Sequence, residues 1–266
     1  MMTSIIVTRL DSMTQPAKYA NVADLYDSYV QTTLDIPFLL DQVKGVPSPV
    51  LELMCGTGRI SLPLLKAGTQ LTCVDKSPEM LAVLDQKLTK RHLSATIHST
   101  DVCLLELHQQ FDRILLPFQC FSELLTPSEQ QQALRRIHQH LSPQGRFICS
   151  LHNPHVRLRA VDGRLKLRAR HALPEARGTL MLWTMETYDP DQKLVHGLRF
   201  LETYDLKGTL QSKRFMDIQF SILEKDRFET LIKEVGFNVL ELYGDYSYGS
   251  FHSESPFLVW VLGKQS

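Results

Sequence analysis

The sequence has no excess of either charge, and this balance limits its partners. Its 266 residues include 29 Lys and Arg and 29 Asp and Glu, so the formal charge is zero at pH 7. Without an overall field, a protein does not attract nucleic acid or an anionic membrane at long range. We therefore expect neither nucleic acid nor a membrane as a partner.

Long apolar runs are also absent. No run approaches the roughly 20 apolar residues of a membrane helix, and residues 1–18 are too polar for a secretory signal peptide. The expected location is the cytoplasm.

The sequence contains few cysteines and no Cys-x-x-Cys pair. An odd number of widely spaced cysteines, mostly inside apolar strand-like runs, predicts reduced, buried thiols. Their spacing does not match a zinc site, so no metal is expected. They are Cys55, Cys73, Cys103, Cys120 and Cys149.

Residues 49–153 alternate short apolar runs with helical patterns, which is typical of a parallel sheet covered by helices. The expected strands are 50–54, 71–75, 95–99, 113–118 and 146–151. Helices are predicted after Ser77-Pro78 and over residues 128–141, where the turn 142–145 ends the second one. A helix over 225–235, ended by Gly236, and strands 237–243 and 257–262 complete the sheet. The predicted fold is α/β, with a Rossmann-like seven-stranded mixed sheet and helices on both faces.

The flanking regions have different patterns. Residues 22–30 and 36–43 predict two short helices over the ligand-binding edge of the sheet, the second capped by Asp35. After the fifth strand, residues 179–188, 194–204 and 214–222 alternate with period two, which predicts an inserted antiparallel sheet. The expected organisation is an N-terminal helical cap (1–46), a main domain (47–155 and 224–266) and an insertion (156–223) that acts as a lid or subunit contact.

Residues 50–59, VLELMCGTGR, run from an apolar strand through Gly56 and Gly58 into a helix. Glycines allow a sharp turn and close approach to a ligand, and the free amides of the helix start face that ligand. A plain tight turn would explain the glycine pair alone. Asp75, however, ends the next strand, where a carboxylate can accept two ribose hydroxyls. Its alternative role is a helix cap, which Ser77 can already provide.

The stretch from Val50 to Asn153 resembles the class I S-adenosylmethionine-dependent methyltransferases, most clearly at ELMCGTGR and CVDKSPEM. With the last helix and two strands, the resemblance covers a little over half of the chain. It implies S-adenosylmethionine as the cofactor and methyl transfer to a nitrogen or oxygen of a small-molecule acceptor. Glycine and amino-sugar N-methyltransferases also have a tyrosine-bearing N-terminal helix, which LYDSY at residues 25–29 resembles.

The resemblance also implies roles for single residues. Glu52 would steady the glycine turn and the methionine amino group, and Asp75 would hold the ribose. The other implied cofactor contacts are Tyr26 at the sulfonium, Gly56 and Gly58 beside the methionine, Lys76 and Met80 flanking the adenine, and Asp101 and Val102 at the adenine edge. Pro117 is a further cofactor-binding candidate because it lies at the carboxyl end of the fourth strand. Each of three residues also has an alternative role that remains open. Met80 would be an ordinary helix core residue, Asp101 would cap a loop, and Tyr26 would only pack against the domain.

Ligands of open parallel sheets bind at the carboxyl ends of the strands. The predicted substrate-binding residues are therefore Phe118, Gln119, His152 and Asn153. The catalytic candidates are Tyr26 and His152, and the histidine would deprotonate or orient the acceptor. The alternative for His152 is a structural role in which its imidazole forms hydrogen bonds only with the backbone of the loop.

Two patterns in the insertion suggest contacts. Four cations alternate with apolar residues, which predicts that they share one strand face: Arg164, Lys166, Arg168 and Arg170. This face is either a solvated outer surface or one that steers an anionic acceptor. Met181, Trp183 and Met185 would share a face of another strand, so the inserted strands could equally form a homodimer surface.

Two other functions stay open. An NAD-dependent oxidoreductase also uses a glycine turn and an acid after the second strand, but Ser61 stands where its third glycine is needed. A non-catalytic S-adenosylmethionine-binding protein would keep the glycines and Asp75, because these residues indicate cofactor binding and not catalysis.

Overall fold

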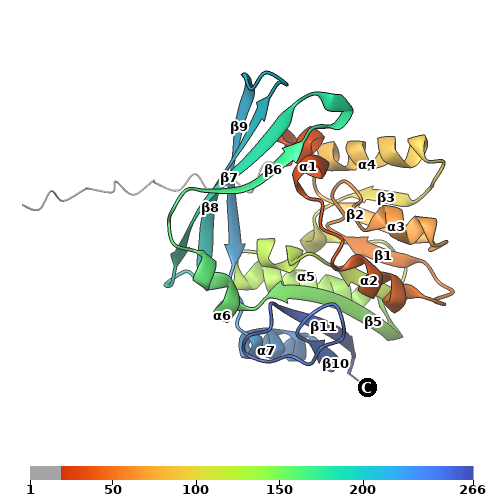
Figure 1. Ribbon diagram of the computed structural model, residues 1–266. Helices are drawn as coiled ribbons and strands as arrows, with labels where there is room; N and C mark the ends of the chain where they lie inside the picture. Colours follow the sequence, from red (N-terminus) through yellow and green to blue (C-terminus); the bar gives the residue numbers. More distant parts are fainter. Residues whose placement is uncertain (1–18, 266) are drawn as a thin grey trace, which may run out of the picture.

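The computed structural model describes residues 19–265, so the expectation for residues 1–18 lies outside the described part. Its main sheet has seven strands in the order β10-β11-β5-β4-β1-β2-β3 (Figure 1). The five neighbouring strands from β3 to β5 pair in parallel, whereas β11 is antiparallel to both β5 and β10. The predicted mixed sheet is confirmed. The strands are β1 (Val50–Leu53), β2 (Leu71–Asp75), β3 (Thr96–Ser99), β4 (Phe111–Leu116), β5 (Leu141–His152), β10 (Phe237–Tyr243) and β11 (Phe257–Lys264).

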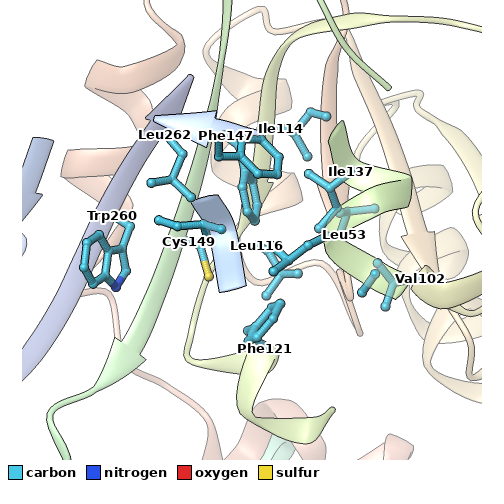
Figure 2. Close-up of a cluster of buried hydrophobic side chains, with 14 of the residues drawn as sticks. Leu53, Val102, Ile114, Leu116, Phe121, Ile137, Phe147, Cys149, Trp260 and Leu262 are labelled. Carbon is cyan, nitrogen blue, oxygen red and sulfur yellow. The ribbon is translucent and has the colours of Figure 1, made fainter. Parts of the chain in front are cut away.

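Helices cover both faces of this sheet because its central strands are apolar on both sides. Leu51 and Leu53 pack with α5 and α7 on one face, and Val50 packs with α2, α3 and α4 on the other. Figure 2 shows part of the first of these cores, around Phe147 and Trp260. The helices are α1 (Ala23–Tyr29), α2 (Ile36–Val43), α3 (Ser61–Lys66), α4 (Pro78–Lys90), α5 (Pro127–His140), α6 (Pro154–Arg157) and α7 (Lys225–Val235). Short 3-10 turns lie at η1 (Tyr19–Asn21), η2 (Val102–Leu104), η3 (Cys120–Glu123), η4 (Leu158–Ala160) and η5 (Pro174–Ala176).

A second, antiparallel sheet follows β5 and α6 in the chain, as predicted, and has the order β6-β7-β8-β9. Its strands are β6 (Lys166–Ala172), β7 (Thr179–Asp189), β8 (Leu194–Tyr204) and β9 (Leu210–Ser221). Leu25 and Tyr29 of α1 pack against Leu180, Leu201 and Met216 of this sheet. The face that α1 covers is called the inner face below. Figure 1 shows α1 between this sheet and α4. The division into cap, main domain and insertion stays a prediction.

Two local predictions were wrong. The stretch 142–145 does not separate α5 from the fifth strand, because β5 already begins at Leu141, which pairs with Phe111. An irregularity in the register absorbs the extra residues, and Gly145 fits there because a Cβ would lie 2.9 Å from the Phe111 carbonyl oxygen. Asp35 makes no side-chain cap to α2; its carboxylate binds a guanidinium instead, as described below.

The predicted cationic face of β6 was also wrong. The register shifts between Leu167 and Ala169, so that Lys166 lies opposite Thr184 and Arg170 opposite Met181. Thr184 and Met181 are three residues apart, so their side chains point to opposite faces of the sheet. Lys166 and Arg170, which pair with them, therefore also point to opposite faces. Arg164 precedes the strand. The four cations therefore do not form one stripe.

All five cysteines have free thiols, as expected, and Cys103 and Cys120 are half-buried rather than buried. Among residues 19–265, no helix has both the length and the apolar character needed to cross a bilayer.

Candidate functional site

A cavity of about 460 Å³ opens at the carboxyl ends of the parallel strands. Its size is within the range of small-molecule sites. Five charged residues line it: Asp75 and Lys76 at the end of β2, Glu79 at the start of α4, Asp101 after β3 and Glu123 after β4. Its apolar and aromatic wall includes Tyr19, Tyr26, Met54, Val74, Met80, Val102 and Leu124.

The turn after β1 has the strained backbone that its glycines permit. Gly56 and Gly58 have φ angles of 56° and 85°, and Met54 also lies in the left-handed region with φ of 53°. A Cβ on Gly58 would come within 2.4 Å of Leu84 Cδ1 on α4. Gly58 is thus required both by the turn and by the close approach of α4.

Asp75 joins this turn to the start of α4. The Gly56 amide donates to its Oδ2 at 2.8 Å, and the Ser77 amide donates to its Oδ1 at 2.9 Å. Burial raises the pKa of Asp75, while these two bonds oppose the rise. An ionised carboxylate has about four acceptor positions, so two remain for hydroxyl groups of a ligand. The Ser77 hydroxyl caps α4 by accepting from the Met80 amide at 3.3 Å, as predicted.

Glu52 lies behind the turn rather than in the cavity wall. Its side chain is buried, and the Ser61 hydroxyl donates to its Oε2 at 2.7 Å. Burial raises the pKa of this carboxyl to about 8. Its contact with a methionine amino group stays a prediction.

Two carboxylates of the N-terminal segment, Asp27 and Asp35, bind side chains of this turn and of α4. The Thr57 hydroxyl donates to Asp27 Oδ1 at 2.6 Å, and Lys87 pairs with the same carboxylate. Arg59 donates to both oxygens of Asp35, at 2.5 and 2.7 Å. Sequence reasoning missed these contacts because no periodic pattern connects charges in separate segments.

Three tyrosines line or flank the cavity on the side of α1. Tyr26 packs edge-to-face on Tyr19 and Tyr29, with ring centroids 6.0 and 5.3 Å apart. The Tyr19 hydroxyl donates to Glu123 Oε1 at 2.9 Å. Tyr19 and Glu123 were not among the predicted site residues, because neither belongs to a motif that is visible in the sequence.

The structure brings most of the predicted cofactor residues together. Tyr26, Gly56, Asp75, Lys76, Met80, Asp101 and Val102 line the cavity, whereas Glu52, Gly58 and Pro117 lie outside its wall. Met80 is both a buried core residue and part of the wall. Asp101 accepts from the Cys103 amide at 2.8 Å, so it caps η2 as well as facing the cavity. The cofactor roles of these residues stay predictions.

The predicted substrate residues after β4 lie beside the cavity wall. Phe118 and Gln119 both have φ of 58°, a backbone conformation that costs free energy and often marks functional sites. The Arg59 guanidinium lies 4.4 Å from the centre of the Phe118 ring. Gln119 donates to the Tyr246 hydroxyl at 2.9 Å.

The two residues after β5 also lie outside the wall. Burial, with a smaller effect from Arg157, lowers the pKa of His152 to about 4, so its imidazole is neutral near pH 7. Asn153 caps α6 and donates to the carbonyls of Ser253 and Ser255, both at 2.8 Å. A substrate contact by either side chain stays a prediction.

Comparison with known proteins agrees with this geometry. Residues 50–145 match the family described as a methyltransferase domain. The glycine/sarcosine N-methyltransferase of Halorhodospira halochloris is 24% identical over 242 residues, which cover 90% of this chain and 84% of that protein. The crystal structure of an S-adenosylmethionine-dependent methyltransferase from Clostridium acetobutylicum has a TM-score of 0.79 at 17% identity, covering 93% of this chain and 99% of the other. The CcbJ methyltransferase from Streptomyces caelestis also has a TM-score of 0.79, at 20% identity and coverage of 92% and 97%.

Proposed function

The chain carries a methyltransferase domain and has the class I S-adenosylmethionine-dependent methyltransferase fold, and from this premise we propose that it methylates a nitrogen or oxygen of a small molecule. The observation that carries the proposal is the position of Asp75 between the glycine turn and the cavity. Experiment should separate this proposal from two alternatives. One is a protein that binds S-adenosylmethionine without transferring its methyl group, and the other is an NAD-dependent oxidoreductase.

The residues present fit S-adenosylmethionine. The free acceptor positions of Asp75 suit two ribose hydroxyls, and Met80 and Val102 offer apolar surface for an adenine. The cofactor, when bound, supplies a methyl group on a sulfonium. The contribution of the protein is to hold the acceptor atom in line with that methyl group and to exclude water, which accounts for most of the rate in such displacements.

Calorimetric titration of the purified chain tests the proposal. S-adenosylmethionine and its demethylated product should bind with one site per chain, and NAD should not bind. Binding of both nucleosides without methylated product from a broad panel of amines and hydroxy compounds would favour the binding protein. Binding of NAD alone would overturn the proposal in favour of an oxidoreductase.

His152 remains the predicted catalytic histidine, and its low pKa favours an orienting role over a basic one. A neutral imidazole with pKa about 4 is a weak base toward an ammonium group. We expect His152→Ala to lower turnover without changing cofactor affinity. Unchanged turnover in that variant would remove His152 from the mechanism.

We also propose a homodimer formed through the face of β7 that Met181, Trp183 and Met185 share. The antiparallel register places these side chains on the face opposite Leu180, which packs on α1. Light scattering of the purified chain would show a single-chain mass if this proposal is wrong.

A cytoplasmic location stays a prediction that cell fractionation can check.

A further inference from the structure

Two opposite charges beside the cavity lack ionic partners. Glu123 lines the cavity, and among residues 19–265 it accepts a hydrogen bond only from Tyr19. Arg199, on β8, has no carboxylate within ion-pair distance in the described part of the chain. Its Nε is buried without a hydrogen-bond partner. Both side chains are half-buried. Charges that are partly removed from water are stabilised by a partner, so a ligand that pairs with both would be stabilised there.

The strand register directs Arg199 toward α1. Arg199 lies opposite Thr184 on β7 and Met216 on β9. Met216 packs in the cluster that includes Tyr29 of α1, so Arg199 shares the inner face of the second sheet. The guanidinium therefore faces the tyrosine side of the cavity.

Other unsatisfied polar groups gather at the same place. In residues 19–265, four buried side-chain atoms have no hydrogen-bond partner, and three of them are Tyr29 Oη, His171 Nε2 and Arg199 Nε. His171 lies opposite Leu180, which belongs to the cluster around Tyr29. Buried polar atoms are nearly always paired in native proteins, so this concentration needs an explanation. A polar ligand between α1 and the inner face would provide one.

The other cations on or beside the inner face are already compensated. Each pairs with a carboxylate: Lys166 with Asp162 at 2.9 Å, Arg214 with Asp24 at 2.6 Å, and Arg157 with Glu186 at 2.6 Å. Arg199 alone among these described cations has no counterion. Its charge also lowers the pKa of Tyr19 and Glu123 against the larger rise from burial, which agrees with its position near the cavity wall.

We infer that the acceptor site is dipolar: Glu123 binds the ammonium group that is methylated and Arg199 binds a carboxylate, so the acceptor is a small aminocarboxylate zwitterion. This inference rests on the proposed methyl transfer. A single guanidinium matches the single charge of a carboxylate and pairs with it through two parallel hydrogen bonds. A diphosphate would keep excess negative charge at this site, because the neighbouring cations are already paired.

The chemistry places Glu123 as the proton acceptor. The ammonium proton passes to the Glu123 carboxylate, which frees the nitrogen lone pair. The acceptor nitrogen then bonds to the methyl carbon while the methyl–sulfur bond breaks and its electron pair stays on sulfur. Burial raises the pKa of Glu123, and a carboxylate with a raised pKa is a stronger base than an exposed one.

Calorimetry on the full chain saturated with the demethylated cofactor tests the inference without relying on turnover. The probes are glycine, β-alanine and 4-aminobutyrate, which differ in the spacing of their charges, and methylamine and acetate, which carry one charge each. We expect at least one of the three zwitterions to bind and both single-charge probes to bind at least about tenfold more weakly, because each loses one charged contact. If the demethylated cofactor binds and none of the zwitterions does, this inference fails while the proposed methyl transfer stands. If the demethylated cofactor itself does not bind, the proposed function fails first.

Matched variants separate the two charges. Glu123→Gln and Arg199→Met should each weaken zwitterion binding by about ten- to a hundredfold, the range for hydrogen bonds to charged groups. Arg199→Lys should recover part of the loss, and circular dichroism shows whether each variant folds. Glu234→Gln on α7 and Arg170→Met on β6 are controls, because both side chains are exposed and lie outside the site. Unchanged zwitterion affinity in folded Glu123→Gln or Arg199→Met would overturn the inference.

Discussion

Replacing Asp75 with Ala should abolish most of the affinity for S-adenosylmethionine. Its carboxylate lines the cavity and accepts from the amides of Gly56 and Ser77, which leaves acceptor positions for two ribose hydroxyls. A hydrogen bond to a charged group contributes about 1.5–3 kcal/mol, so losing two of them predicts a rise in Kd of at least about a hundredfold. Calorimetric titration with S-adenosylmethionine measures this directly.

The control for that experiment is Asp85→Ala, which removes an exposed carboxylate from α4. Its Kd should stay within about twofold of the wild type, because surface substitutions away from a site have small effects. Asp75→Asn keeps one side-chain acceptor and should bind with intermediate affinity. An Asp75→Ala variant that is folded and binds as tightly as the Asp85→Ala control would contradict the assignment of Asp75 to the ribose.

Replacing Glu52 with Gln should change how the stability of the ligand-free protein depends on pH. Burial raises the pKa of Glu52 to about 8, well above the value of about 4.3 for an unfolded chain. The folded state therefore binds this proton more tightly, and the stabilisation is fully present below about pH 4. It is lost as the pH rises toward 8, at no more than about 1.4 kcal/mol per pH unit.

Gln cannot ionise, and it resembles the protonated carboxyl in shape. Urea denaturation of Glu52→Gln should therefore give a free energy of unfolding close to the wild type near pH 4 and higher than the wild type near pH 8.5. Part of the wild-type slope should remain, because burial also raises the pKa of Asp75 and Glu123. Glu234→Gln, on the exposed side of α7, should retain the full wild-type slope. A Glu52→Gln variant with the same pH dependence as this control would show that Glu52 is ionised in the folded protein.

The sequence by itself was enough to predict the seven-stranded sheet and the second, antiparallel sheet. It also supplied the candidate residues for the cofactor end of the proposed site. The cofactor motif is local in the sequence. The first strand, the glycine turn, the helix after it and the acid at the end of the second strand follow one another closely along the chain. The periodicities of the strands and helices are local too, so composition and spacing predict them. For this reason local spacing singled out Gly56 and Asp75, whereas the family resemblance added Met80; all three line the same cavity.

Only the tertiary structure decided what surrounds the acceptor end. Tyr19 meets Glu123 across more than a hundred residues, and Arg199 reaches the same region from the inserted sheet. Such pairs leave no periodic trace, because each residue type also suits an ordinary surface position. The bulge in β6 likewise reversed the predicted cationic face, since one extra residue moves the following side chains to the other side. Local spacing predicts which elements form, whereas the charges that meet between them depend on how those elements pack.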